Sequence, residues 1–237
     1  MSWHNAFVLL VVLTFFAGCK SEKRDDLPDV SGISPVKLKI RRFEQDLFKL
    51  DTLKIASELP FLKSKYGEFA NIFFDQILNS TSAEVAPQGE AAYVKGFITH
   101  PAVRKLYDTC QVLYPQLPET TISQLEEAMR YYKYYFPQRR IPTLTTFISE
   151  YTVGNFVYKN DDLAIGLDFF LGENYPYLNY SPDNPNFSQY LTRSFNKEHL
   201  AVKTLLPLVN DLVGEAPPGE NLLDYMIHNG KRMYLLD

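Results

Sequence analysis

The spacing of apolar side chains predicts helices in the first half of the chain and again at its end. Apolar and basic residues alternate from 36 to 43, which is typical of a strand with one buried face. From Phe43 onward the spacing changes to three or four residues, with Leu47 and Leu50 on the same stripe, which indicates a helix. Leu53, Ile55 and Leu59 continue the supply of apolar residues after this stripe. The same periodicity predicts further helices over residues 69–78, 91–99, 101–113, 121–136, 200–212 and 222–234.

The middle of the chain has the composition of strands. Three segments are rich in Thr, Val, Ile, Phe and Tyr, namely residues 142–150, 151–159 and 162–170. The breaks at Gly154-Asn155 and Asn160-Asp161 have the chemistry of turns, so we predict an antiparallel meander that the strand near residue 36 joins. The predicted fold class is α+β, predominantly helical with a small antiparallel sheet in the middle.

The first residues read as a secretory signal. An apolar run from Ala6 to Ala17 has 12 residues, which is too short to span a bilayer, and small residues precede Cys19. This resembles a bacterial lipoprotein signal, in which the cysteine thiol receives a diacylglycerol and palmitate joins the anchor. We predict a signal peptide over 1–18, acylation of Cys19, a flexible polar tether over 19–35 and one globular domain over 36–237. The alternative is an ordinary signal peptide with a chance cysteine.

Composition narrows the class of protein further. The hydrophobic content of 46% is enough for a real core, and the net charge of −4 comes with no basic block, so nucleic acid is not an expected partner. Apart from Cys19 the chain has only Cys110, which excludes an internal disulfide once Cys19 is acylated. We interpret Cys110 as a buried helix residue rather than a reactive thiol.

The order of elements resembles that of gluzincin metallopeptidases, which place His-Glu-x-x-His on the helix after the sheet. Here that helix carries Glu198 and His199 without a second histidine one turn later, and the next helix carries His228 without a nearby glutamate. Two histidines without a carboxylate make a poor zinc site. We therefore predict no metal, no cofactor and no catalytic residue.

Two features allow a functional interpretation beside a structural one. Asp168 stands in an apolar segment and Glu150 ends a neighbouring one, so the two could act as general acid and base. We favour the interpretation that Asp168 binds backbone N–H groups at a turn or sheet edge. The helix around 131–135 is rich in tyrosine, and we favour packing against the core, with the hydroxyls at the rim, over a ligand-stacking surface.

The chain resembles the gliding motility lipoprotein GldB family of Bacteroidetes. The residues that carry the resemblance are the lipoprotein signal and, in order, the segments 36–48, 131–150, 163–172 and 226–237. The resemblance implies a zincin-like layout that has lost its metal ligands. Of the functional residues, it transfers only Cys19. It also implies a further helical segment after the final Leu-Leu-Asp, which leaves open that the domain is truncated at its C-terminus.

The same resemblance implies a function. It suggests a non-catalytic structural or assembly lipoprotein of the gliding and type IX secretion machinery, held by membrane lipid and surrounded by other envelope proteins. Lys20 is not an inner-membrane retention aspartate, which favours the outer membrane. We expect the body to face the periplasm. The alternatives are a ligand-binding envelope lipoprotein that uses the Tyr-rich helix and a zinc metallopeptidase with an unorthodox site.

Overall fold

The computed structural model describes residues 27–180, 185–216 and 221–236. The chain divides into two units, Met1–Ile33 and Ser34–Asp237. In the described part of the first unit, the Asp29 carboxylate accepts hydrogen bonds from the backbone N–H and hydroxyl of Ser31. The predicted signal peptide and Cys19 lie outside the described residues, as does the start of the predicted tether.

Helices make up most of the second unit. The α-helices are α2 (Phe43–Phe48), α3 (Ile55–Tyr66), α4 (Glu68–Asn71), α5 (Glu90–Thr99), α6 (Pro101–Leu113), α7 (Glu119–Tyr135), α8 (Gln189–Thr192), α9 (Leu200–Val213) and α10 (Leu222–Leu236). A π-helix, η1 (Ile72–Ile77), continues α4, and the 3-10 turns are η2 (Leu167–Phe169), η3 (Tyr177–Asn179), η4 (Pro185–Phe187) and η5 (Lys197–His199). The helices predicted over 69–78, 91–99, 101–113, 121–136, 200–212 and 222–234 are present within a few residues of these ranges, whereas α3 was not predicted as a separate helix. None of the helices in these ranges is both long and apolar enough to cross a membrane.

The sheet has four strands, β1 (Ile40–Arg42), β2 (Leu144–Phe147), β3 (Phe156–Tyr158) and β4 (Asp162–Gly166), in the order β1-β2-β4-β3. The α+β class is confirmed, and the early strand joins the sheet as predicted. The prediction of an antiparallel meander is wrong, because β1 and β4 both run parallel to β2 and only the β3–β4 pair is antiparallel. The sheet is therefore mixed.

The reason for this error lies between β2 and β3. The Asn160-Asp161 turn does form the predicted hairpin between β3 and β4. The chain from 148 to 155, however, does not return beside β2. It carries β3 to the outer edge, and β4 then lies next to β2 in the same direction. All five residues of β4 are buried, as expected of a strand covered on both faces.

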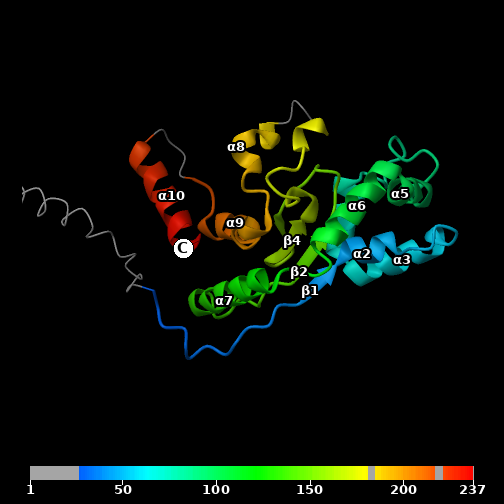
Figure 1. The fold of residues 1–237 in the computed structure, drawn as a ribbon. Helices are drawn as coiled ribbons and strands as arrows, with labels where there is room; N and C mark the ends of the chain where they lie inside the picture. Colours follow the sequence, from blue (N-terminus) through cyan, green and yellow to red (C-terminus); the bar gives the residue numbers. More distant parts are fainter. Residues whose placement is uncertain (1–26, 181–184, 217–220, 237) are drawn as a thin grey trace, which may run out of the picture. The chain divides into compact units, whose positions relative to one another are not determined.

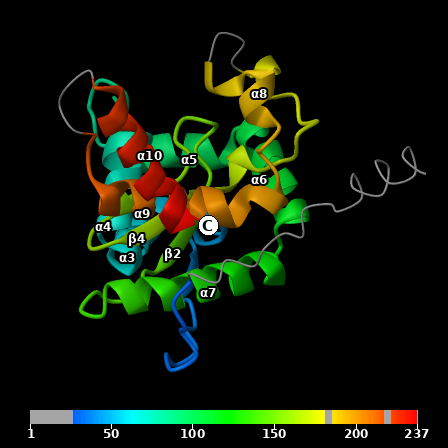
Figure 2. The ribbon, with the colours of Figure 1, turned by 90° about the vertical axis from the view of Figure 1, so that its left-hand side faces the viewer.

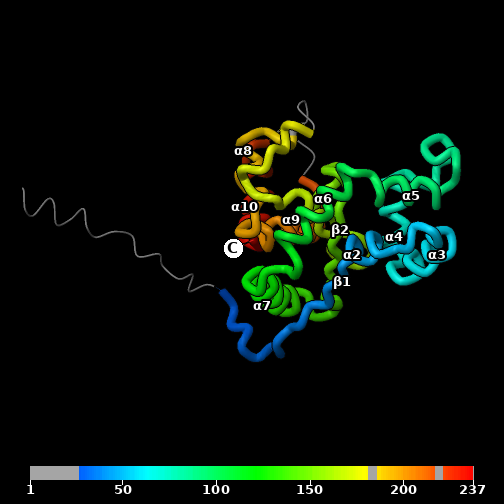
Figure 3. The backbone as a smooth tube through the Cα atoms, turned by 45° about the vertical axis from the view of Figure 1, so that its right-hand side comes forward, coloured from blue at the N-terminus to red at the C-terminus, as the bar shows by residue number. Residues whose placement is uncertain are grey.

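Helices lie on both sides of the strands. In Figures 1 and 3, α2, α3 and α5 gather on one side, and α9 and α10 on the other. Helix α9 packs against β3 and β4, and α7 and α10 pack against α9. The sheet is thus the layer that joins the N-terminal helices to the C-terminal ones.

An aromatic cluster forms the centre of the core on the N-terminal side. The ring of Phe43, at the start of α2, has its centroid 4.9 Å from that of Tyr66, 5.0 Å from Phe69, 4.6 Å from Phe73 and 6.0 Å from Phe74. Most of these pairs are edge-to-face, the arrangement that the ring quadrupole favours. Phe43, Phe69, Phe73 and Phe74 are completely buried. The cluster therefore ties α2, α3, α4 and η1 into one body.

We predict that Phe43→Ala lowers the free energy of unfolding by about 3–5 kcal/mol, because it removes a buried ring and leaves a cavity. Urea denaturation followed by circular dichroism measures this change. The control is Phe61→Ala on α3, whose side chain is 75% exposed and whose loss should change stability by less than about 0.5 kcal/mol. Equal effects of the two substitutions would contradict the assignment of Phe43 to the core.

Candidate functional site

The carboxylate of Asp168 lies in η2, directly after β4, and is completely buried. Its Oδ2 atom accepts hydrogen bonds from the backbone N–H of Ser149 at 3.0 Å and of Tyr151 at 2.7 Å, and the Ser149 hydroxyl lies 3.4 Å away. The prediction that Asp168 binds backbone N–H groups at a turn is confirmed. Glu150, the other member of the proposed acid–base pair, has an exposed side chain. A buried carboxylate beside an exposed one gives no support to a shared catalytic role.

The turn that Asp168 holds is conformationally demanding. Glu150 and Tyr151 both have positive backbone φ angles, of 53° and 62°. Residues other than glycine seldom adopt this backbone conformation. The loop behind the turn packs closely on the sheet, since a Cβ atom at Gly166 would lie 2.8 Å from the carbonyl oxygen of Val153. Asp168 and Gly166 together keep this loop folded against the end of β4.

Burial raises the pKa of Asp168 to about 6, although the hydrogen bonds from Tyr151 and Ser149 act to lower it. Its Oδ1 atom is buried without a hydrogen-bond partner. The folded protein therefore binds a proton at Asp168 more readily than the unfolded chain does.

A second buried acid, Glu44, lies at the junction of β1, α2 and β2. It is completely buried, its Oε1 atom lies 2.6 Å from Nε of Arg42, and its Oε2 atom accepts a hydrogen bond from the Thr146 hydroxyl at 2.7 Å. The Arg42 guanidinium also donates to the carbonyl oxygens of Tyr114 and Pro115. Every partner in this network is structural. Sequence reasoning did not single out this pair, and its only signal was Arg-x-Glu at a strand-to-helix boundary.

His199 and His228 belong to no group of three metal-ligating side chains among the described residues. His199, in η5, is exposed and its Nδ1 lies 2.7 Å from Oδ1 of Asn196, while His228 is half-buried on α10. Across residues 27–180, 185–216 and 221–236, no three His, Cys, Asp or Glu side chains form a group able to hold a metal ion.

Cys110 lies on α6 and is buried, which confirms its assignment to the interior. Burial, with the nearby Asp168 carboxylate as a smaller cause, raises the pKa of its thiol well above the ordinary value. The thiolate form is therefore disfavoured, and Cys110 is not a reactive nucleophile.

The Tyr-rich helix α7 divides its tyrosines between core and surface. Tyr132 is buried and donates a hydrogen bond to Asp161, and burial followed by this bond raises its pKa to about 12. Asp161 also forms a salt bridge with Arg139, whose Nη1 atom lies 3.0 Å from Oδ1 of Asp161. Tyr134 and Tyr135 are exposed, and the hydroxyls of Tyr135 and Tyr234 on α10 are 3.3 Å apart. The prediction of packing against the core is thus confirmed for Tyr132, but its hydroxyl is buried against Asp161 and does not lie at the rim. Tyr134 and Tyr135 remain on the surface.

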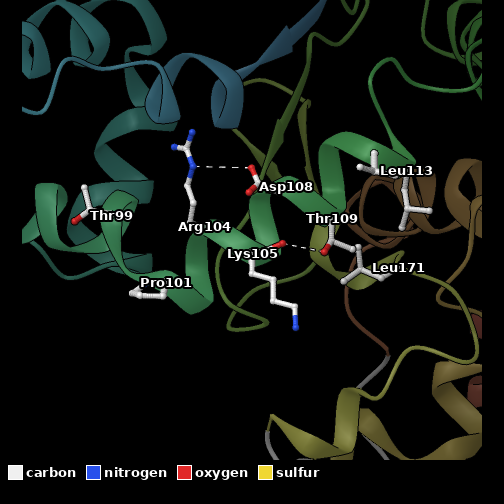
Figure 4. Close-up of a pocket in the computed structure, with 9 residues that line it drawn as sticks. Thr99, Pro101, Arg104, Lys105, Asp108, Thr109, Leu113 and Leu171 are labelled. Atoms are coloured by element: carbon white, nitrogen blue, oxygen red, sulfur yellow. Dashed lines mark hydrogen bonds and ion pairs between the residues drawn. The ribbon is translucent and has the colours of Figure 1, made fainter.

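A groove of about 720 Å³ runs along α6, lined by residues between Pro101 and Leu113 together with Thr99 and Leu171 (Figure 4). The Nε atom of Arg104 lies 3.9 Å from Oδ1 of Asp108. The Lys105 ammonium forms no ion pair with any residue in the described ranges. The apolar side chains of Val112 and Leu113, the last two residues of α6, are exposed. The groove has the chemistry to hold a weakly anionic, partly apolar group, and the sequence predicted no site here.

Comparison with known families gives a direct result. Residues 23–237 match the family described as gliding motility protein GldB, and the chain belongs to that family. No curated protein and no solved structure matches it. The zincin-like layout therefore stays a prediction. Membership associates the chain with gliding motility and, as the family is one of lipoproteins, with the cell envelope.

We predict that Asp168→Asn changes how stability depends on pH. The folded pKa of about 6 lies above the ordinary 3.8, so the stabilisation is fully present below pH 3.8 and is lost as pH rises through 6. The asparagine keeps an oxygen for the two N–H groups and cannot ionise. Relative to this variant, the wild type should lose stability between pH 3.8 and 6, as measured by urea denaturation at a series of pH values.

The comparison variant Asp168→Ala removes the acceptor altogether. It leaves two buried N–H donors unsatisfied, and we expect its free energy of unfolding to lie below that of Asp168→Asn by about 1–3 kcal/mol for each donor at every pH. Parallel pH profiles for the wild type and Asp168→Asn would show that Asp168 does not titrate as described.

Proposed function

We propose that this member of the GldB family is a membrane-anchored lipoprotein that acts as a non-catalytic structural or assembly component of the gliding motility and type IX secretion machinery. The observation that carries the proposal is the family match over residues 23–237, which covers nearly all of the chain after the predicted signal peptide. The proposed location is the outer membrane, with the body facing the periplasm. Other gliding and secretion proteins of the envelope are the proposed partners.

The interior of the domain supports a structural role. The fully buried carboxylates Asp168 and Glu44 are bound by backbone N–H groups and by Arg42 and Thr146, and these bonds hold a turn and a strand-to-helix junction in place. Charged groups used in this way stabilise a fold rather than act on a substrate. The architecture thus accounts for the charge of these two buried carboxylates.

The surface supports a role in assembly. Helix α10 exposes several large apolar side chains in neighbouring turns, among them Leu222, Met226 and Met233. Single exposed apolar residues are ordinary, but contiguous ones mark interaction sites. A component that holds other envelope proteins needs surfaces of this kind.

Acylation at Cys19 is the proposed means of attachment. Each buried methylene of an acyl chain contributes about 0.8 kcal/mol, and one chain alone binds only marginally, so stable anchoring needs more than one. A lipoprotein anchor with two or three chains meets that requirement. The polar segment after Cys19, which includes Lys20, Ser21 and Glu22, would then separate the body from the bilayer.

The test is genetic. Deletion of the gene in its own gliding host should abolish colony spreading and alter the secreted protein profile. Wild type should restore both, and Cys19→Ala should restore neither. Cys110→Ala is the matched control, because it removes the other thiol and leaves the anchor intact.

Two outcomes would contradict the proposal. Normal spreading and secretion in the deletion strain would remove the chain from the machinery. Full rescue by Cys19→Ala, with the protein absent from the membrane fraction, would show that the lipid anchor is not required.

The metallopeptidase alternative makes an opposite prediction about metal. On our proposal, the purified protein contains far less than one zinc ion per chain, measured by mass spectrometry after dialysis without chelator. Stoichiometric zinc that is lost in His199→Ala or His228→Ala would favour the enzyme instead.

A further inference from the structure

Tyr151 connects the turn that Asp168 holds to a cluster of aromatic rings in the segment after η2. Its backbone N–H donates to the Asp168 carboxylate at 2.7 Å, and its side chain is buried. The ring centroid of Tyr151 lies within 6.2 Å of four other rings, those of Tyr175, Tyr177, Tyr180 and Phe187. One residue therefore belongs to both the turn and the cluster.

Hydroxyl groups extend this connection to the surface. The hydroxyls of Tyr151 and Tyr175 are 2.6 Å apart, and Tyr175 donates to the hydroxyl of Tyr180 at 3.1 Å. The rings of Tyr175 and Tyr180 are stacked, and Tyr180 is exposed. Three linked hydroxyls thus join the buried turn to the exposed part of the segment 172–180.

The segment 172–180 is also attached to one wall of the α6 groove. The Tyr177 hydroxyl accepts a hydrogen bond from the backbone N–H of Leu171 at 2.8 Å, and Leu171 lines the groove. Figure 2 shows the chain that leads to α8, in yellow, on a side of the molecule away from α3 and α7. The rings around Phe43, which include Tyr66 of α3, belong to a different part of the core.

The Asp168 carboxylate has hydrogen-bond partners at only one of its oxygens. Oδ2 accepts from backbone N–H groups of the turn, whereas Oδ1 is buried without a partner. The titratable groups that face Asp168 are the Cys110 thiol of α6 and the hydroxyls of Tyr151 and Tyr177, and their raised pKa values keep them uncharged near neutral pH. Strand β2 also packs against η2 and has no titratable side chain, and Glu150 of the turn is exposed. A proton on Oδ1 therefore removes the buried charge and leaves both bonds to Oδ2 intact.

Ionisation of Asp168 opposes the closed turn. Burial raises the pKa of Asp168 to about 6, because the ionised carboxylate loses its water in the folded protein. When the turn opens, water reaches Oδ1, and the positive φ angles of Glu150 and Tyr151 are released. The ionised form therefore favours the open turn, and the protonated form favours the closed one.

We propose that Asp168 and Tyr151 form a latch, in which ionisation of Asp168 loosens the turn 149–151 and the Tyr151 hydroxyl transmits each opening to the segment 172–180. The opening is local, since it separates the rings of this segment from Tyr151 and leaves the rest of the fold in place. Because Tyr177 holds the backbone of Leu171, an opening of the segment also changes one wall of the α6 groove. The inference goes beyond the proposed function and does not depend on it.

The direction of the pH dependence follows from the two pKa values of Asp168. The folded value of about 6 lies above the ordinary 3.8, so the stabilisation of the closed turn is fully present below pH 3.8 and is lost as pH rises through 6. The equilibrium constant for opening therefore increases on the order of a hundredfold across this range and is constant above it. Between pH 4.5 and pH 7, an increase of about tenfold or more is expected.

The test is hydrogen exchange measured by mass spectrometry on the full chain, purified in detergent, at pH values from 4.5 to 7. After correction for the intrinsic pH dependence of amide exchange, peptides that cover 149–155 and 172–180 should exchange about tenfold or more faster at pH 7 than at pH 4.5. Peptides that cover η1 should stay protected throughout, because the opening is local. In Asp168→Asn, which keeps an oxygen for the turn and cannot ionise, the pH response of both segments should disappear.

Tyr151→Phe separates the two halves of the latch. It keeps the ring and the backbone bond to Asp168, and it removes the hydroxyl that meets Tyr175. The segment 172–180 should then exchange faster than in the wild type at pH 4.5 and lose its pH response, while 149–155 keeps its response. Tyr132→Phe is the matched control, because it removes a buried tyrosine hydroxyl bonded to a different partner, Asp161, and should leave both segments unchanged.

Three results would overturn the proposal. One is the same pH response in the wild type and in Asp168→Asn, and another is a response at 149–155 that does not extend to 172–180. The third is exchange of both segments with the same free energy of opening as η1, which would mean that only global unfolding exposes Asp168. The wild-type pH profile and Tyr151→Phe test the latch independently of whether Asp168→Asn folds.

Discussion

Asp168 accepts hydrogen bonds from the backbone of Ser149 and Tyr151, and the arrangement of the sheet depends on the turn that these bonds hold. Two residues with positive φ would not keep this conformation without an acceptor at the right place. After this turn the chain forms β3 at the edge of the sheet, and β4 then lies between β2 and β3. The β2–β4 pair is parallel, β4 is buried along its whole length, and α9 packs against β3 and β4. One buried carboxylate thus links local backbone strain to topology.

The sequence predicted what depends on neighbouring residues and missed what depends on distant ones. Helices α6, α7 and α9 were found because a stripe at helical spacing is a local pattern, and the β3–β4 hairpin because Asn160-Asp161 is local turn chemistry. The direction of β2 relative to β4 depends on a contact between residues 149 and 168, which no periodicity records. Asp168 was assigned correctly because a carboxylate in an apolar segment needs donors. The Arg42–Glu44–Thr146 network was missed because Thr146 is a hundred residues away.

The structure separates the tasks of interior and surface. Inside, rings pack around Phe43, and hydrogen bonds hold the buried carboxylates of Asp168 and Glu44. On the surface, α10 exposes apolar residues to solvent. The α6 groove is lined by the Lys105 ammonium and by the exposed aliphatic side chains of Val112 and Leu113. The periodicity of α10 was visible in the sequence. Which side of it faces the body was not, because a helical wheel identifies a stripe and not its neighbour.

The π-helix η1 contains one residue more in its turn than an α-helix would. Leu78 donates its N–H to the carbonyl oxygen of Phe73, five residues back, so this turn holds one residue more than an α-helical turn. The wider turn lets consecutive residues, Phe73 and Phe74, both reach the ring of Phe43. The π-helical turn therefore accommodates one additional residue, and the register of α4 before it and of the loop after it is unchanged. In an evolving sequence, such a turn is a place where an insertion or deletion is absorbed locally, and its cost falls on the aromatic core rather than on the helices at either end.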